Sequence, residues 1–415
     1  MNASSILIMT LVQEVVPGRS VASHAVYPHP RPRPSPRRAN PPSTSPARRL
    51  WRHLSVRHPL GRRLRGLRPP DLPVRRCPRL ASCPSGETVR KALLANLPDG
   101  AELERRFNRA LVTDLPRALR HRRQRLAADL TLIPYHGKPC DNDLEIYRSQ
   151  AKSGTSHFHA YATLYLVSKG QRYTLALTWV QRGAALEAVL RRLLRRASRV
   201  GVRPQLLLLD RGFYSVNVIR YLQAARYPFL MPVVCRGRQD DHPLGASGTR
   251  VFQYFRRSGW GDYTLTNADG RRATVSICVA CRNRAGERGR VGRQALVYAY
   301  WGCTPAAYDW VRQTYRSRFG SETSYRQLHE GKAKTCTRNP VVRLFLVGVA
   351  LVRRNVWVWL HWEQLSSPRR GRRCLRPERL RFKGLLQWLL EVAQERFGTR
   401  DESCSDRPIN QELMS

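Results

Sequence analysis

The sequence predicts an α/β protein whose mixed sheet is flanked by helices, and three observations predict this fold class. Segments with alternating apolar and polar residues open the region 127–235. A segment with helical periodicity then separates them from a short, fully apolar segment, and a second helix and a further strand complete the region. With 415 residues and 42% hydrophobic residues, the chain is long enough to bury a large core.

Three strands are predicted first. Residues 127–134 alternate as a half-buried strand does, and residues 158–167 and 173–180 are predicted as two more strands. The four residues between the last two strands, Ser-Lys-Gly-Gln at 168–171, are typical of a hairpin turn. The second and third strands are therefore expected to pair with each other in antiparallel orientation.

Helices and strands then alternate. Residues 184–200 place apolar side chains on one helical face, at Leu186, Val189, Leu190, Leu193, Leu194 and Ala197. Residues 205–209 form a short apolar run that ends at Asp210, which predicts a buried parallel strand. A helix over 216–225 and a strand over 228–234 complete the order β-β-β-α-β-α-β, which is the order of the ribonuclease-H-like fold.

The segment 236–304 interrupts this alternation. It contains turn signals, and strand-like runs at 249–255, 273–281 and 294–301 predict a β-rich insertion. Pro305 then opens a long predicted helix that continues to about Glu330. Residues 341–360 predict another helix, although Arg343, Arg353 and Arg354 interrupt its apolar character.

The predicted ribonuclease-H-like domain comprises residues 127–235 and 305–362, and two helical regions flank it. Residues 86–126 are expected to form short helices broken by prolines. They could form a small region that binds nucleic-acid ends, or they could pack against the core. Residues 363–415 are expected to form a basic tail that contains a helix over 380–396.

The charge of the chain is extreme, because 74 Lys and Arg residues stand against 29 Asp and Glu, a formal net charge of +45. About +14 of this charge lies in residues 1–85, where sixteen Arg accompany two acidic residues. The proline content of that segment predicts disorder. The segment is either a basic arm on DNA or non-coding sequence translated from a mis-assigned start. The excess on the remaining chain opposes folding unless a polyanion neutralises it, so nucleic acid is the expected partner.

The lack of long apolar runs and the cysteine content bear on where in the cell the protein is found. No apolar run approaches the roughly 18 residues that a membrane span requires, so no membrane partner is expected. The ten cysteines lack the regular spacing of a disulfide framework, which fits a reducing environment. We expect a cytoplasmic protein.

Asp129 is the first residue to which chemistry is assigned. It lies inside an otherwise apolar strand, with Thr131 on the same face. A buried carboxylate without a partner is costly, so Asp129 needs a cation, a metal ion or a set of hydrogen-bond donors. The alternative is an aspartate that caps the end of the strand.

Asp210 is the second such residue. It follows the apolar run 206–209 and precedes Arg211-Gly212-Phe213. Catalytic groups gather at the carboxyl ends of parallel strands, which favours a role in a site. The alternatives are an aspartate that caps the next helix or one that Arg211 neutralises.

Glu322 is the third. Tyr315, Arg318 and Glu322 are spaced so that a ring, a cation and a carboxylate share one helix face, although a solvated amphipathic face has a similar composition. Carboxylates from three separate elements are what a two-metal phosphoryl-transfer site requires. Oxygen ligands of this kind suit Mg²⁺ or Mn²⁺.

Together these residues resemble the insertion-sequence DDE transposases, which carry a Tyr-x2-Arg-x3-Glu-x6-Lys signature. Tyr315, Arg318 and Glu322 match its first three places. Asp129-Leu130-Thr131 and Asp210-Arg211-Gly212-Phe213 are similar to the first and second Asp motifs of that family, and residues 152–161 are similar to its second-strand region. The resemblance covers residues 127–340, roughly half of the chain, and the family has a β insertion where this chain has one.

The resemblance implies a DNA transposase that cleaves the ends of its element and joins them to target DNA. Asp129, Asp210 and Glu322 would be the catalytic residues and would bind two Mg²⁺ (or Mn²⁺) ions. Arg318 would contact a phosphate, and Tyr315 would position the flanking DNA. Synapsis of two element ends implies a homodimer. The resemblance also implies a prokaryotic protein that associates with the nucleoid.

Further DNA contacts are expected from less specific signals. The last place of the signature holds His329 in place of Lys, so its phosphate contact falls to His329 or to Lys332. Arg211 beside the second Asp is another candidate for DNA binding. Trp260 and Trp301 in the insertion could stack on an unpaired base, or could instead belong to the core of the insertion.

Three other functions remain open from the sequence. A ribonuclease-H-like DNA nuclease needs the carboxylates but neither the Tyr-Arg-Glu helix face nor strand transfer. A domesticated DNA-binding protein without transposition has no need of an intact triad. A ribosomal or RNA-associated basic protein gives no reason for a carboxylate at the end of an apolar strand.

Overall fold

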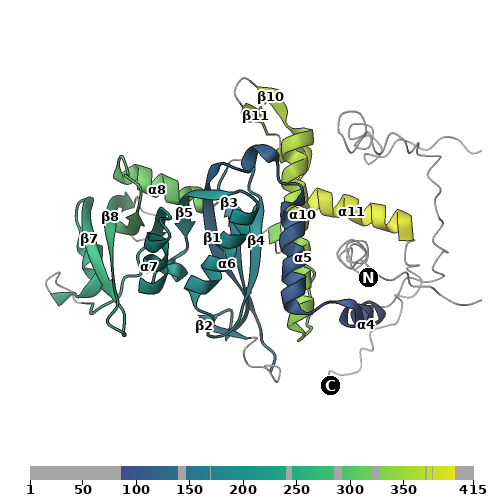
Figure 1. Cartoon of the computed structure of the whole chain (residues 1–415), viewed down its shortest axis with the longest axis horizontal. Helices are drawn as coiled ribbons and strands as arrows, with labels where there is room; N and C mark the ends of the chain where they lie inside the picture. Colours follow the sequence, from purple (N-terminus) through teal and green to yellow (C-terminus); the bar gives the residue numbers. More distant parts are fainter. Residues whose placement is uncertain are drawn as a thin grey trace, which may run out of the picture. The chain divides into compact units, whose positions relative to one another are not determined.

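The protein is described by a computed structural model of residues 86–397 (Figure 1). Its gaps are residues 139–145, 169, 240–244, 285–291, 320–326, 329, 370–371 and 376. The chain divides into two units, one of residues 97–382 and one that combines residues 1–96 with 383–415. In the second unit the structure describes α4 (Gly86–Asn96) and most of α11 (Phe382–Phe397).

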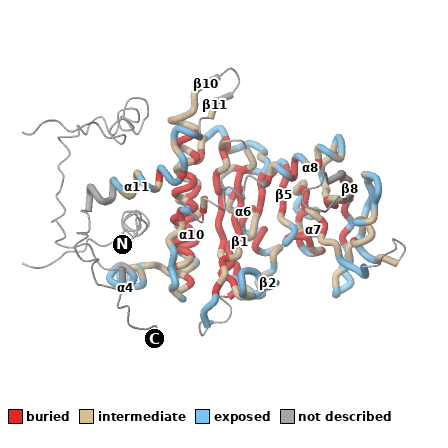
Figure 2. Tube along the Cα trace, turned by 180° about the vertical axis from the view of Figure 1, so that it is seen from behind, coloured by how far each residue is buried: buried red, intermediate tan, exposed pale blue. Residues whose placement is uncertain are grey.

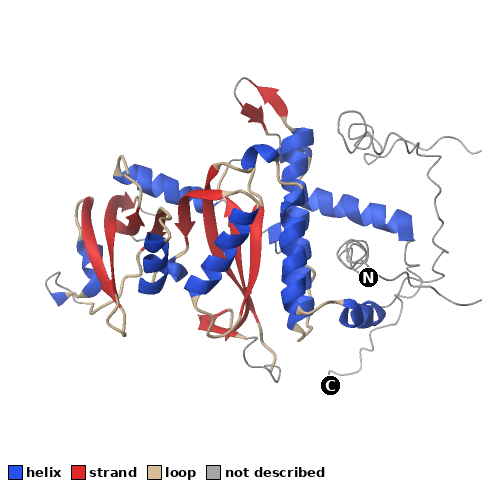
Figure 3. Cartoon of the chain, in the orientation of Figure 1, coloured by secondary structure: helices blue, strands red, loops and turns tan. Residues whose placement is uncertain are grey.

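Residues 97–382 form a nine-stranded mixed sheet with helices on both faces (Figure 3). Its order is β2-β3-β1-β5-β6-β9-β8-β7, and β2 and β4 pair with successive stretches of β3. The pairs β1–β5 and β5–β6 are parallel, and the others are antiparallel. The strands are β1 (Arg123–Pro134), β2 (Tyr147–Lys152), β3 (Thr155–Leu166), β4 (Thr174–Val180), β5 (Arg203–Leu209), β6 (Phe229–Pro232), β7 (Gly259–Thr266), β8 (Arg272–Arg284) and β9 (Gly292–Trp301).

Helices connect and cover these strands. The α-helices of this unit are α5 (Gly100–Thr113), α6 (Leu186–Arg199), α7 (Val216–Ala224), α8 (Tyr308–Arg316) and α10 (Pro340–Trp359). Shorter helical turns are η1 (Arg117–Leu119), η3 (Arg211–Phe213), η5 (Gly248–Tyr254), η6 (Ser317–Phe319), η7 (Leu360–Leu365) and η8 (Pro377–Arg379). A separate small hairpin consists of β10 (Ser367–Arg369) and β11 (Arg372–Cys374).

The alternation of side chains along β1 assigns its residues to two cores. Ala128 faces the core that contains the apolar stripe of α6 and the buried residues of α7. Ala127 faces a second core with Val311 and Tyr315 of α8. Because Asp129 is two residues from Ala127, it lies on the α8 side of the sheet. Figure 2 shows how the central strands and α10 are buried along most of their length.

The open edge of β4 is covered by side chains of α5 and α10. Asn108 of α5 donates to the Leu177 carbonyl and accepts from the Leu177 amide, at 2.8 and 2.9 Å. Asn355 of α10 binds the amide and the carbonyl of Thr174 in the same way, at 2.8 Å each. Unpaired strand edges invite aggregation, so these asparagines replace the strand that β4 lacks.

Glu104 of α5 completes this cover. Its carboxylate accepts from the Trp179 amide at 2.6 Å and from the Thr178 hydroxyl at 3.0 Å, and it forms an ion pair with Arg196 of α6. The Glu104 side chain is 10% exposed, so its charge is largely removed from water. The same residue therefore joins two helices to the edge strand.

The sequence predicted most elements at the right places. The strands predicted at 127–134, 158–167, 173–180, 205–209 and 228–234 correspond to β1, β3, β4, β5 and β6. The helices predicted at 184–200, 216–225, 341–360 and 380–396 correspond to α6, α7, α10 and α11. The antiparallel β3–β4 hairpin and the parallel β1–β5 pair are confirmed.

Three predictions about elements were wrong. Residues 249–255 were predicted as a strand but form η5, a 3₁₀ turn in which Thr249 bonds the Val234 carbonyl. The helix predicted from Pro305 to Glu330 is not continuous, because α8 ends at Arg316 and continues as the 3₁₀ turn η6. The helical region predicted to extend to residue 126 ends earlier, since β1 begins at Arg123. Strands β2 and β7 were not predicted.

The β-rich segment 236–304 adds to the main sheet. Its strand β9 pairs with β6 through the register Leu230↔Tyr300, and β8 and β7 follow outward. This pairing joins segments that are about 70 residues apart in the chain. The apolar periodicity of one segment does not show which distant strand it pairs with, so the sequence could not predict this pairing. The sheet therefore extends from the central strands through the segment.

Replacing Gly348 by alanine is expected to destabilise the protein by about 1–3 kcal/mol. A Cβ at this position of α10 would lie 2.4 Å from a ring carbon of Phe107, which is buried in α5. Alanine ordinarily stabilises a helix by about 1 kcal/mol over glycine, so the packing conflict has to exceed that gain. Urea unfolding measures the difference. The matched substitution Gly261→Ala, where a Cβ meets nothing within 4 Å, should leave stability nearly unchanged.

Candidate active site

Asp129 occupies the middle of the sheet. It lies in β1 between β3 and β5, where its register partner on β3 is Thr163. One of its carboxylate oxygens accepts the amide of Leu130 at 2.9 Å. Its side chain is 13% exposed, so the carboxylate is largely withdrawn from solvent and not at an exposed strand end. A buried charge of this kind requires compensation.

Asp210 follows β5, the parallel neighbour of β1. The register pairs Ala128 with Leu209, which brings the next residue of each strand, Asp129 and Asp210, to the same edge of the parallel pair. Helix α7 is capped by the Ser215 hydroxyl, and the Asp210 side chain caps neither α7 nor η3. The alternative that Asp210 is a helix cap is therefore wrong.

Arg318 joins the two carboxylates. Its Nη1 lies 3.1 Å from Asp129 Oδ2, and its Nη2 lies 3.2 Å from Asp210 Oδ1. The Arg318 side chain is 9% exposed, against 37% for Asp210, so the cluster is open to solvent mainly on the Asp210 side. One guanidinium thus holds two carboxylates that are 81 positions apart in the sequence.

Tyr315 supports the guanidinium through its ring. The Arg318 guanidinium carbon lies 5.2 Å from the centre of the Tyr315 ring, which is a cation–π contact. Tyr315 is 3% exposed, and burial raises the pKa of its hydroxyl well above the ordinary range. The ring predicted to position flanking DNA is therefore packed inside the protein in this structure.

Electrostatics keep Arg318 charged. Burial by itself lowers the pKa of the guanidinium, but Tyr315, Asp129 and Asp210 outweigh it and raise the pKa above its ordinary value. Neighbouring side chains position the turn: the Tyr165 hydroxyl lies 3.4 Å from the Arg318 carbonyl, and Arg172 lies 3.3 Å from the Ser317 carbonyl. The cluster is consequently a fixed arrangement of one cation between two anions.

These two carboxylates fit a hard divalent cation. Each presents oxygen atoms to a shared positive charge, here the guanidinium, and carboxylate oxygens are the ligands that Mg²⁺ and Mn²⁺ prefer. Within the described ranges no three His, Cys, Asp or Glu side chains gather as a metal site. The predicted third ligand, Glu322, lies outside the described residues, as does His329.

The other residues predicted to bind DNA are distributed over several elements. Arg211 is exposed in η3, directly after Asp210. Lys332 is half-buried, and burial, followed by the nearby Arg343, lowers the pKa of its amine. Trp260 of β7 is 43% exposed and stacks on Tyr308 with ring centres 4.6 Å apart.

Trp301 lies at the end of β9, far along the sheet from the carboxylates in strand order. It pairs with Phe229 of β6 and packs, half-buried, against the core under α6 and α7. Asp129 and Arg318 lie on the other side of the sheet, so the structure does not bring Trp301 into the carboxylate cluster.

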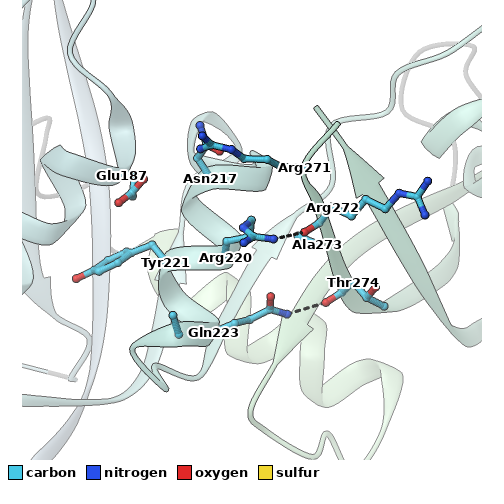
Figure 4. Close-up of a pocket in the computed structure, with 10 residues that line it drawn as sticks. Glu187, Asn217, Arg220, Tyr221, Gln223, Arg271, Arg272, Ala273 and Thr274 are labelled. Carbon is cyan, nitrogen blue, oxygen red and sulfur yellow. Dashed lines mark hydrogen bonds between the residues drawn. The ribbon is translucent and has the colours of Figure 1, made fainter. Parts of the chain in front are cut away.

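An open pocket lies on the α6–α7 side of the sheet (Figure 4). Two hydrogen bonds connect α7 with β8 in this pocket. They run from Arg220 to the Arg272 carbonyl at 3.0 Å and from Gln223 to the Thr274 carbonyl at 2.6 Å. It contains none of the predicted site residues. The convergent carboxylates, and not this pocket, are the candidate for catalysis.

The sequence did not predict the partner of Asp129. Arg318 was assigned to phosphate because of its place in the signature, whereas in this structure it binds both aspartates. The available signal was the buried aspartate itself, which requires a cation within the fold. The spacing of 189 residues between the partners gave no indication of which cation it is.

Comparison with known proteins finds no family model that matches the chain and no curated protein that matches it. Among the described helices, none is both long and apolar enough to cross a membrane. The residues around Asp129 and Asp210 are therefore the basis for assigning a function.

Proposed function

We propose that this chain is a DNA transposase of the DDE type with a ribonuclease-H-like catalytic domain. It would cleave the ends of an insertion sequence and join them to target DNA by metal-dependent phosphoryl transfer. The observation that carries the proposal is the convergence on one cation of Asp129, which lies within β1, and Asp210, which follows the carboxyl end of the parallel neighbour β5. Catalytic carboxylates of α/β sheets gather at this edge.

The net charge of +45 supports a polyanionic substrate. Asp129, Asp210 and Glu322 would hold Mg²⁺ or Mn²⁺, which supplies Lewis acidity and an activated water when bound. Arg318 would leave the carboxylates and bind a phosphodiester oxygen as the DNA strand enters. Tyr315 would keep the Arg318 guanidinium oriented toward the site during this exchange, because its ring lies against the guanidinium.

The pairing of carboxylates with Arg318 has a physical consequence for the substrate-free protein. Two neighbouring carboxylates without a cation would repel each other, and the burial of Asp129 would add to the cost of folding. Arg318 supplies that charge from within the chain, so the site is stable before DNA and metal arrive. The negatively charged phosphodiester would then replace the two carboxylates as the partner of Arg318.

The test is strand cleavage and joining on DNA that flanks the reading frame. With Mg²⁺, the wild-type chain should nick at the element boundary, leave a 3′-hydroxyl and join that end to a target plasmid. Glu322→Gln should lose both reactions and still bind the duplex in a gel-shift assay. The matched variant Glu330→Gln changes an exposed carboxylate eight residues later in the sequence and should behave as wild type.

The outcomes separate the rival functions. Cleavage without joining would identify a nuclease of the same fold. Binding without cleavage would identify a DNA-binding protein that does not transpose. Joining of paired ends by a dimer, measured by crosslinking during the reaction, is expected because transposition brings two ends together. Full activity of Glu322→Gln would contradict the assignment of this residue.

A further inference from the structure

Three buried polar side chains lie close to Asp129 without hydrogen-bond partners in the described part of the chain. The atoms are Thr131 Oγ1, both ring nitrogens of His159, and the Tyr161 hydroxyl. The residues are 9%, 1% and 1% exposed. A buried polar group without a partner costs about 1–3 kcal/mol, so three in one place require an explanation.

The sheet register places these side chains on one face. Thr131 of β1 pairs with Tyr161 of β3, and Ile133 pairs with His159. Residues opposite each other in an antiparallel pair project to the same side of the sheet. Thr131 is two residues from Asp129, so this face is also the face of the carboxylate cluster. Along the strands, Thr131 and Tyr161 lie about 7 Å from the level of Asp129, and His159 lies about 14 Å from it.

Two cations border this patch. The Arg343 guanidinium carbon lies 5.5 Å from the centre of the Tyr135 ring, whose own centre lies 5.1 Å from that of His159. Arg343 donates its Nε to the Thr337 carbonyl at 2.7 Å. Lys332 is close enough to Arg343 for each cation to disfavour the other. Neither Lys332 nor Arg343 forms an ion pair with a described acidic side chain.

The two described charged side chains that act on the His159 imidazole, Arg343 and Lys332, are both positive. Burial first, and then Arg343 and Lys332, lower the pKa of its imidazole to about 4, so the ring is neutral at pH 7. A neutral imidazole can donate one hydrogen bond, and the Tyr161 and Thr131 hydroxyls can each donate another. Three donors beside these two cations match a tetrahedral oxyanion, whereas a metal ion would be repelled by the same cations.

We propose that Thr131, His159 and Tyr161, together with Lys332 and Arg343, form a binding site for a backbone phosphate of the DNA strand. This inference rests on the proposed function, because it takes the ligand to be the strand whose neighbouring phosphodiester lies at Asp129 and Asp210. Successive phosphates of one strand advance about 3.4 Å along the duplex axis. A site that extends from about 7 to about 14 Å from Asp129 along the strand therefore fits a phosphate a few positions from the scissile one.

The site would fix the register of the strand. Phosphate contacts position a nucleic acid without reading its sequence. Desolvated donors of fixed geometry hold a single phosphate more specifically than the exposed arginines elsewhere on this basic chain do. The phosphate would also supply the hydrogen bonds that the three buried side chains lack in the protein alone.

Inorganic phosphate is the first probe, added to the full chain against chloride at equal ionic strength while thermal unfolding is followed. Wild type should be stabilised by phosphate in a saturable manner. His159→Phe should weaken the apparent phosphate affinity by about 10-fold or more, and Tyr161→Phe by about 5-fold. Tyr161→Phe removes one oxygen and keeps the ring, so it provides the test even if His159→Phe does not fold.

The matched control is Tyr173→Phe. Tyr173 is 1% exposed and its hydroxyl also has no described partner, but it belongs to the core on the other side of the sheet. Its variant should respond to phosphate as wild type does. Equal phosphate responses in wild type, Tyr161→Phe and His159→Phe would overturn the proposal.

A second measurement separates this inference from the proposed function. Equilibrium binding of an element-end duplex in EDTA should weaken by about 5-fold or more in Tyr161→Phe and remain unchanged in Tyr173→Phe. If wild type cleaves and joins DNA but Tyr161→Phe binds the duplex normally, the phosphate site is wrong and the transposase assignment stands. If phosphate binding depends on Tyr161 while no cleavage occurs, the anion site stands and the enzymatic assignment fails.

Discussion

Replacing Asp129 by asparagine is expected to lower the rate of Mg²⁺-dependent DNA strand cleavage by about 1,000-fold or more. Asparagine has the same shape as aspartate but removes the negative charge that a divalent ion requires. Asp129 is the more buried of the two described carboxylates, with a side chain 13% exposed. Water molecules therefore have little access to this position and cannot take the place of the lost carboxylate as a metal ligand. Single-turnover cleavage of a labelled element-end duplex measures the change.

The fold should survive this substitution. Arg318 retains Asp210 at 3.2 Å as a charged partner, and an asparagine side chain in place of Asp129 would keep an oxygen toward the guanidinium. Circular dichroism should therefore report a native spectrum and a thermal midpoint within a few degrees of wild type. Asp309→Asn on α8 is the control, because Asp309 pairs with Arg312 at the surface. Cleavage by Asp129→Asn at the wild-type rate would contradict the proposed site.

Replacing Glu104 by alanine is expected to destabilise the protein by about 3–5 kcal/mol. The substitution leaves Arg196 of α6 without its buried partner and leaves the Trp179 amide and the Thr178 hydroxyl unsatisfied. A loss of this size corresponds to a fall in the thermal midpoint of roughly 10 °C for a unit of this length. Chemical denaturation followed by tryptophan fluorescence measures the free energy.

The control for Glu104 is Glu187→Ala. Glu187 also forms an ion pair with an arginine, Arg191, but both side chains are substantially exposed at 28% and 46%. Exposed ion pairs four residues apart on a helix contribute only about 0.3–0.5 kcal/mol, so this variant should unfold close to wild type. Equal stability of the two variants would show that the ion pair at the β4 edge does not stabilise the fold.

The core of the sheet could be predicted because its signals are local. The alternation of 127–134 and the apolar run of 205–209 each report burial within a few residues, and both became adjacent strands. Asp210 was placed at a strand end for the same reason. The 3₁₀ turn η5 contradicted the prediction for 249–255, since the Thr249 hydroxyl bonds distant backbone groups that its own segment cannot specify.

The site could be predicted only in part. The positions of Asp129 and Asp210 followed from their strands, whereas the partner of both, Arg318, depended on the packing of α8 and η6 over the sheet. The continuous helix expected to carry Tyr315, Arg318 and Glu322 changes to a 3₁₀ turn at Ser317, so the spacing of these residues along an α-helix does not by itself place Arg318. The assignment of Glu322 and of His329 stays a prediction.

The sequence by itself predicted most strands and helices of the central sheet, the placement of Asp129 within one strand and of Asp210 at the end of another, and a strongly positive net charge. The tertiary structure decided which cation Asp129 and Asp210 share, how α5 and α10 close the β4 edge, and that β9 extends the sheet beside β6. It also decided that Thr131, His159 and Tyr161 lie on one face of β1 and β3, buried and without hydrogen-bond partners among the described residues. The physical reason is that periodicity reports which way a side chain faces, whereas the identity of the group it meets depends on the register between segments far apart in the chain.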